Sequence, residues 1–183
     1  MRFARNVRQL SKDEISLAFE VFKNSLPSWE RIVITDGLGP LPTYNHPYTD
    51  NITGLFRLNL GPEVYTDAAD DTKYYGDYGR YDALFIHEMT HVWQYYHGYG
   101  VVLRSLWANT LGAGYEYTPG NPWDDYNVEQ QAHIIEDWHL HGQSPTDPRF
   151  VYVDKIIRKG IESNMIGNRI IKLPFDELQN LDL

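Results

Sequence analysis

The sequence predicts a single domain of the α+β class, in which a few short strands pack against long helices. Three segments carry this prediction. Residues 83–96 form an apolar stretch long enough for a central helix, residues 54–61 alternate like a half-buried strand, and residues 11–14 have the spacing of a helix capping box. Because a chain of 183 residues can bury one sizeable core, we expect residues 1–183 to form one domain.

The amino-terminal half is expected to contribute one helix and two strands. The capping box that begins at Ser11 predicts a helix over about residues 12–24. Residues 31–37 (RIVITDG) and residues 54–61 (GLFRLNLG) are each typical of a short strand. Proline and asparagine between them predict a loop over residues 39–51. The apolar residues of the second strand fall on one face: Phe56, Leu58 and Leu60.

The carboxyl-terminal half is expected to be mainly helical. Residues 126–141 have helical spacing of their apolar side chains, and residues 153–165 are expected to form a last helix. The segment that ends near residue 113 is expected to be helical or irregular. The apolar positions of the 126–141 helix are Val128, Ala132, Ile135 and Trp138.

Charge and composition exclude several classes of function. The 25 acidic and 16 basic residues give a net charge of -9, which would repel a nucleic-acid backbone. No apolar run approaches the ~20 residues of a bilayer span, and the opening MRFARNVRQLSKDE lacks the apolar segment of a secretory signal. The chain has no cysteine, so histidines and carboxylates are the available metal ligands.

The segment HEMTH, residues 87–91, has the spacing of a metal-binding helix. Four residues turn an α-helix by about 40°, so His87 and His91 lie on one face and can offer two nitrogens to one ion. Glu88 lies about 100° round from His87, where it can reach a water molecule on that ion. Apolar residues flank the motif, and burying an unpaired His pair would be costly. The pattern therefore favours an HExxH metal site over a satisfied core pair.

Two residues are candidates for the third metal ligand. His97 stands where the extended pattern HExxHxxGxxH has its third histidine, but Gln94 replaces the glycine that lets the helix end. In an unbroken helix His97 points away from the ion, and it is more typical of a helix end, where it interacts favourably with the dipole. Glu129 would leave a fourth position open, which is typical of catalytic zinc. Spacing alone leaves both candidates open.

Two motifs resemble those of a known family. FIHEMTHVWQ (residues 85–94) and DYNVEQQAHIIEDW (125–138) are similar to the zinc metallopeptidase domains associated with VgrG spike proteins of bacterial type VI secretion, a gluzincin-like group of the HExxH…E type. The opening segment, residues 10–34, is also similar. The resemblance reaches to about residue 140 and implies a zincin-like domain, with a small mixed sheet packed on a central HExxH helix and a second ligand-bearing helix.

The resemblance also implies roles for particular residues. His87, His91 and Glu129 would be the ligands of Zn²⁺, and Glu88 would be the general base of peptide hydrolysis.

Other residues are candidates for less direct roles. Tyr126 and His133 flank Glu129 and could each donate to a developing oxyanion, as could Tyr117 on the preceding loop. His133 is also a candidate partner of the metal ligands, as is Glu136. The resemblance also implies that the strand over residues 54–60 corresponds to the strand that binds the substrate backbone by edge pairing in many zinc peptidases.

The implied function is that of a zinc metallopeptidase used as an antibacterial effector of type VI secretion. We expect a peptide or protein substrate, with a secretion spike protein or a cognate immunity protein as partner. We expect synthesis in the bacterial cytoplasm, export by the secretion system and action in a target-cell periplasm. Two alternatives remain: a zincin-fold adaptor of the spike with little or no turnover, and a hydrolase of cell-wall peptide or amide bonds.

Overall fold

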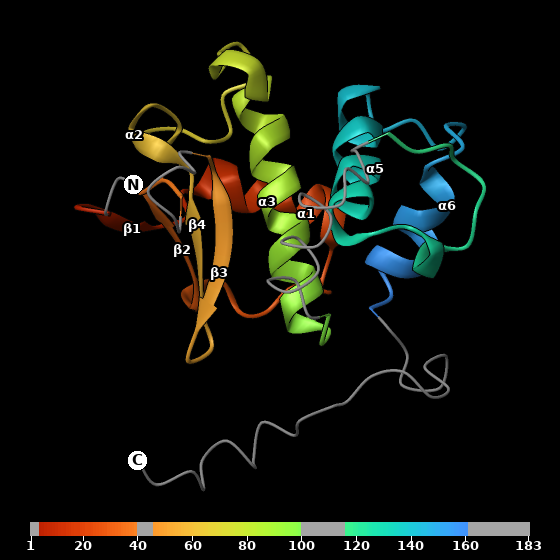
Figure 1. Ribbon diagram of the computed structural model, residues 1–183, viewed down its shortest axis with the longest axis horizontal. Helices are drawn as coiled ribbons and strands as arrows, with labels where there is room; N and C mark the ends of the chain where they lie inside the picture. Colours follow the sequence, from red (N-terminus) through yellow and green to blue (C-terminus); the bar gives the residue numbers. More distant parts are fainter. Residues whose placement is uncertain (1–3, 40–45, 100–115, 161–183) are drawn as a thin grey trace, which may run out of the picture.

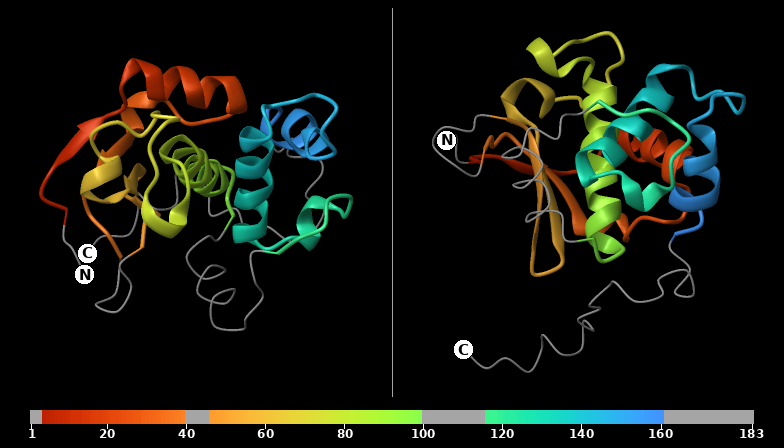
Figure 2. Two further views of the ribbon diagram at one scale, coloured as in Figure 1. Left: turned by 90° about the horizontal axis from the view of Figure 1, so that it is seen from above. Right: turned by 45° about the vertical axis from the view of Figure 1, so that its right-hand side comes forward.

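The computed structural model describes residues 4–39, 46–99 and 116–160. Within them, a four-stranded sheet, helix α3 (Tyr81–Tyr96) and helix α5 (Val128–Leu140) lie in a row with α3 in the middle (Figure 1). Helix α1 (Lys12–Phe22) passes behind α3 in Figure 1 and, seen from above, lies along one side of α3 and the sheet (Figure 2, left). The prediction of an α+β fold with a small mixed sheet is confirmed for these residues.

The sheet contains β1 (Val7–Gln9), β2 (Ile32–Thr35), β3 (Tyr48–Ile52) and β4 (Leu55–Asn59). Their order is β1-β2-β4-β3. β2 runs parallel to β4, whereas β1 is antiparallel to β2 and β3 is antiparallel to β4. Strands β3 and β4 are joined by a two-residue turn, Thr53-Gly54, in which both residues have positive φ and which matches the twist of a hairpin.

Two predictions about this sheet are wrong. Residues 39–51 were expected to form a loop, but β3 begins at Tyr48. Two polar residues conceal the strand in the sequence: Asp50 pairs with Arg57 on the outer face, and Asn51 is exposed near the hairpin turn. The strand over residues 54–60 was expected at a free edge, but β4 is paired on both sides and β3 occupies the edge.

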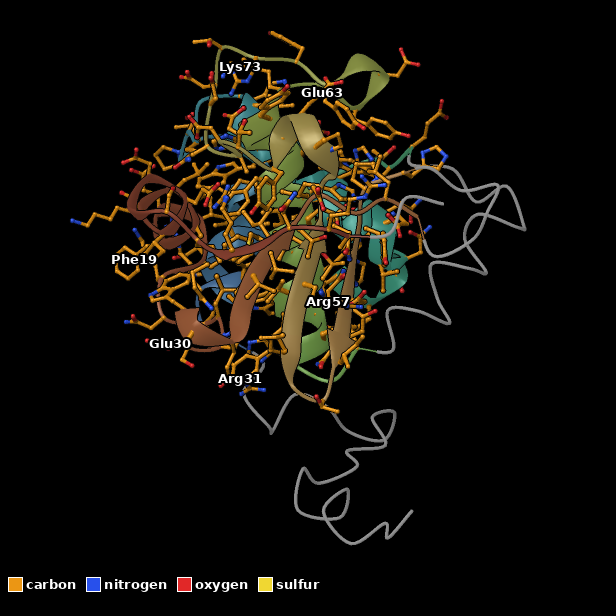
Figure 3. All side chains as sticks on the ribbon, turned by 90° about the vertical axis from the view of Figure 1, so that its left-hand side faces the viewer. Phe19, Glu30, Arg31, Arg57, Glu63 and Lys73 are labelled. Atoms are coloured by element: carbon orange, nitrogen blue, oxygen red, sulfur yellow. The ribbon has the colours of Figure 1, made fainter. Side chains whose placement is uncertain are left out.

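The two faces of the sheet differ in chemistry. The outer face, turned toward the viewer in Figure 3, carries Arg57 in a two-pronged ion pair with Asp50, its cross-strand neighbour, at 2.7 Å. On the inner face Phe56 and Leu58 are buried. The inner face therefore holds α3 against the sheet through apolar contact.

The helices largely follow the predicted ranges. α1 has the expected capping box at Ser11 and ends at Phe22, two residues early. The last helix begins before the predicted range, as α6 (Phe150–Tyr152), and continues into the π-helical η4 (Val153–Ile157); the predicted range beyond residue 160 lies outside the described residues. Most of the segment that ends near residue 113 also lies outside them. The short elements are α2 (Gly61–Val64), η1 (Trp29–Arg31), η2 (Gly76–Tyr78) and η3 (Trp123–Asp125).

The apolar core surrounds α3. Trp93, near the carboxyl end of this helix, is fully buried and donates its indole N–H to the carbonyl of Ile157 at 3.1 Å. Trp138 and the predicted apolar positions of α5 are also buried. Packing on all sides fixes the position of α3 and of the residues it carries. In the described part of the chain, no helix has both the length and the apolar character to span a bilayer.

A buried carboxylate ties α1 to the rest of the domain, and its removal should reduce stability. Glu14 accepts two hydrogen bonds of 2.7 Å from Arg8 and one each from the amides of Ser11 and Ala68. Burial alone would raise the pKa of Glu14, but these contacts lower it below its usual value. The folded carboxylate therefore stabilises the protein above the unfolded-state pKa of about 4.3, and this contribution is lost as the pH falls through the lower folded-state pKa.

We expect Glu14→Gln to lower the free energy of unfolding at pH 7 by about 3–5 kcal/mol, as for a buried pair that loses one partner. The difference from wild type should shrink at pH 3 and below. Urea unfolding at both pH values measures this effect, with the exposed α1 residue Glu20 as the matched Glu20→Gln control. Equal stability of the Glu14 and Glu20 variants at pH 7 would contradict the prediction.

Candidate metal centre

His87 and His91 lie one turn apart on the face of α3 that packs against α5. Both side chains are buried, and the centroids of their rings are 5.0 Å apart. Core packing fixes the rotation of α3 about its axis. The Nε2 atoms of His87 and His91 therefore face the same residue. That residue is Glu129, in the first turn of α5.

Glu129 completes a compact group of three ligand atoms. Its Oε2 lies 3.5 Å from Nε2 of His87 and 3.5 Å from Nε2 of His91. Atoms arranged tetrahedrally about 2.0–2.1 Å from a zinc ion lie about 3.3 Å from one another. The spacing therefore fits a tetrahedral metal with these three ligands and one further position.

Hydrogen bonds on the far side of each imidazole fix its orientation. Nδ1 of His87 lies 2.9 Å from Oε2 of Glu136, and Nδ1 of His91 lies 2.7 Å from Oε1 of Gln94. Because both partners present acceptor oxygens, each Nδ1 carries a proton, and Nε2 is the nitrogen that can bind a metal once any proton on it is displaced. This is the tautomer that metal binding through Nε2 requires.

The carboxylate of Glu129 and the two imidazoles each stabilise the charged form of the other. Burial alone would raise the pKa of Glu129, but the neighbouring imidazoles of His91 and His87 lower it well below its usual value. Burial alone would lower the pKa of His87, but hydrogen bonds to Glu129 and Glu136 raise it well above its usual value. A cation bound at these atoms therefore competes with protons for the imidazoles.

Glu88 is buried beside the group and is held by the edge strand. The hydroxyl of Thr49, in β3, lies 2.7 Å from Oε2 of Glu88. Burial raises the pKa of Glu88, and the nearby His91 and His87 offset only part of the increase. A buried carboxylate with a raised pKa is suited to accept and return a proton near neutral pH.

A second group in the described residues has the spacing of metal ligands: His87, His133 and Glu136. Nδ1 of His133 lies 3.4 Å from Oε2 of Glu136. The same carboxylate oxygen already makes a normal hydrogen bond to His87. We therefore favour the group containing Glu129, whose Oε2 lies equally close to both imidazole Nε2 atoms, and assign Glu136 to holding His87.

His97 lies outside both groups, as its helical position predicts. It is the residue that caps the carboxyl end of α3, and its Nε2 lies 2.8 Å from the carbonyl oxygen of Ser25. Burial lowers the pKa of His97, so the ring is neutral near pH 7. The expected charge interaction with the helix dipole is therefore weak, and His97 instead joins α3 to the segment after α1.

The candidate oxyanion donors occupy different places. The hydroxyl of Tyr126 donates to the carbonyl of Thr118 at 2.6 Å. The hydroxyl of Tyr117 donates to Asp137 at 2.5 Å. The ring of His133 lies 4.9 Å from that of His87, centroid to centroid, so His133 is the candidate nearest the metal ligands.

A hollow of about 880 Å³ adjoins the group through His133. The loop before α5, one face of α5 and Arg149 form its walls. Its other lining residues are Glu116, Tyr117, Thr118, Pro119, Asn121, Asp125, Tyr126, Gln130 and Asp137. These residues place a polar space beside the candidate metal centre.

Two residues with clear roles in this geometry were not predicted. Gln94 was considered only as the replacement for a glycine, although its position three residues after His91 places it on the same helix face. Thr49 could not be found, because its strand was predicted as a loop.

Fold and site together define an α+β domain with a His₂Glu candidate metal centre between two packed helices. No protein-family model matches the sequence. The chain is 32% identical over 162 residues to the type VI secretion system spike protein VgrG2b of Pseudomonas aeruginosa strain PAO1, a match that covers 81% of this chain and 15% of that protein. The solved effector domain of Pseudomonas aeruginosa VgrG2b is 31% identical, with a TM-score of 0.59, and the match covers 85% of this chain and 86% of that domain. The chain belongs to the family of the VgrG2b effector domain.

Proposed function

We propose that the protein is a zinc-dependent metallopeptidase. The observation that carries this proposal is the 3.5 Å spacing of Glu129 Oε2 from the Nε2 atoms of both His87 and His91. Glu88 follows His87 directly and is buried next to the same point. A His₂Glu set with one position left for water is typical of catalytic zinc.

The metal and the protein would divide the chemistry. When bound, Zn²⁺ would polarise the scissile carbonyl and acidify a water molecule. Glu88 takes the proton of the attacking water and returns it to the leaving amine. The hydroxyl of Thr49 engages Oε2 of Glu88, which leaves Oε1 as the oxygen for that proton.

We assign substrate backbone binding to β3 in place of β4. The sheet order makes β3 an edge strand, and Thr49 links it directly to Glu88. An extended peptide paired to this edge would bring its carbonyl groups past α3. The hollow next to His133 would then receive a substrate side chain on the far side of the ligands.

His133 is the oxyanion donor that the contacts favour. The hydroxyls of Tyr126 and Tyr117 already donate to groups within the protein, whereas the His133 ring packs directly on a metal ligand. Burial and the neighbouring His87 lower the pKa of His133, so the ring is neutral near pH 7. To act as the oxyanion donor, the ring would have to direct its one N–H away from Glu136, whose Oε2 lies 3.4 Å from Nδ1.

The family relationship supports a role as a type VI secretion effector. The relative VgrG2b is a spike protein, and this chain spans about 15% of its length. We propose that the present chain forms a single effector domain, is exported with or on such a spike, and acts on peptide bonds in a target cell. A cognate immunity protein would protect the producing cell.

Hydrolysis is tested by incubating the zinc-loaded protein with a diverse peptide library and identifying products by mass spectrometry. We expect cleavage at a limited set of sequences, loss of cleavage on chelation and recovery on adding zinc. Cell-wall peptides in the same library would test the alternative substrate. A zinc-loaded protein that cleaves nothing would contradict the peptidase proposal and favour the spike adaptor.

A further inference from the structure

Gln94 is a buried polar side chain beside the candidate ligands, and the proposed function gives it no role. It is fully buried near the end of α3, and it contacts one candidate metal ligand and the residue before another. Oε1 lies 2.7 Å from Nδ1 of His91, and Nε2 lies 2.9 Å from the carbonyl oxygen of Val128, which precedes Glu129.

The orientation of the Gln94 amide follows from a chain of contacts that begins at the backbone. The carbonyl oxygens of Trp123 and Tyr126 can only accept hydrogen bonds, and Gln131 reaches both, at 3.0 and 3.3 Å. Its NH₂ group must therefore face them, which turns its Oε1 toward Gln94 at 2.9 Å. Gln94 in turn must present its own NH₂ group to Gln131.

The same reasoning fixes the proton on His91. Since the NH₂ group of Gln94 donates to both Val128 and Gln131, its oxygen faces His91 and accepts from Nδ1–H. Nε2 of His91, which faces Glu129, is then the nitrogen available to a metal. A carboxylate at residue 94 would lack the donors that bind Val128 and Gln131.

We infer that Gln94 is a positioning residue that sets two of the three metal ligands at once. Its oxygen selects the tautomer and ring orientation of His91, and its NH₂ group anchors the start of α5, from which Glu129 projects. The inference rests on the proposed metal centre and assigns Gln94 no contact with substrate or metal. It differs from the contact of Glu136 with His87, which involves one ligand only.

The first test is zinc affinity, measured by chelator competition on the full chain. We expect Gln94→Leu to weaken zinc binding by about 10–100-fold, the usual effect of removing a hydrogen-bond partner of a ligand. Thr90→Val is the matched control, because Thr90 is equally buried on α3 and its hydroxyl donates to the carbonyl of Ile86 in the same helix. It should bind zinc within about threefold of wild type. Equal affinities for the Gln94 and Thr90 variants would overturn the inference.

The second test is spectroscopic and separates positioning from general loss of stability. In the zinc-loaded protein with ¹⁵N-labelled histidine, we expect protected Nδ1–H resonances for both His87 and His91. Gln94→Leu should lose the His91 resonance to solvent exchange and keep that of His87. Gln94→Glu should keep both, since an oxygen still faces His91, and should bind zinc more weakly than wild type. Loss of both signals or of neither in Gln94→Leu would overturn the inference.

Wild type alone provides a test if Gln94→Leu does not fold. Rapid exchange of the His91 Nδ1–H in the zinc-loaded protein would show that Gln94 does not hold it. None of these measurements uses hydrolysis. A protein that binds zinc with a protected His91 but cleaves no peptide would refute the peptidase activity and leave the role of Gln94 intact, whereas a protein that binds no zinc would refute both.

Discussion

Glu88→Gln is expected to lose almost all peptide hydrolysis while it retains its zinc. The substitution preserves the size of the side chain and the oxygen that faces Thr49, but it removes the group that accepts the proton of the attacking water. General acid–base groups of this kind contribute about 10²–10⁴-fold, so we expect kcat/KM to fall by about that factor. Steady-state kinetics on a substrate from the peptide library would measure it, with zinc content determined on the same samples.

Glu63→Gln is a suitable control for this experiment. Glu63, labelled in Figure 3, is an exposed carboxylate in α2, an element that carries none of the candidate ligands. Its variant should be as active as wild type. A Glu88→Gln protein with full activity would show that Glu88 is not the general base.

Glu129→Gln is expected to have the largest effect on metal binding. The change keeps the shape of the side chain but replaces a charged carboxylate oxygen by a weak amide ligand, and it leaves the imidazoles of His87 and His91 without their shared acidic partner. We expect the affinity for zinc to fall by more than the about 10–100-fold typical of losing a hydrogen-bond partner of a ligand. Hydrolysis at limiting zinc should be lost in parallel.

Glu136→Gln provides the comparison, because Glu136 contacts Nδ1 of His87 but is not assigned to the metal. The Glu136→Gln protein should lose no more than about 10–100-fold in its affinity for zinc. If the Glu136 variant bound zinc more weakly than the Glu129 variant, the metal would belong to the alternative group that contains His133 and Glu136.

The helices that carry the candidate site could be predicted because the spacing of residues in the sequence agrees with how these helices pack in the fold. The apolar spacing of residues 126–141 specifies which face of α5 is buried, and the spacing of HEMTH specifies which face of α3 carries both histidines. Reciprocal capping at Ser11 places the start of α1 correctly. The proximity of Glu129 to His87 and His91 was implied by resemblance, since helical periodicity says nothing about which helices pack together.

The sheet edge and the hydrogen bonds around the ligands were harder to predict for physical reasons. β3 has polar residues on a face that remains open to solvent, so its alternation pattern is weak. The contact from Thr49 to Glu88 depends on a long-range pairing of that strand. The Gln94 amide bonds to Val128 and Gln131 of α5, and this contact depends on how two helices pack, which the spacing of residues within one helix does not encode.

Metal analysis of the purified wild-type protein tests the central claim most directly. Elemental analysis combined with zinc X-ray absorption spectroscopy should find one zinc ion per chain, bound by two imidazole nitrogens and one carboxylate oxygen at about 2.0–2.2 Å. A protein that takes up no zinc at neutral pH, or a bound zinc whose spectrum shows no imidazole, would contradict it.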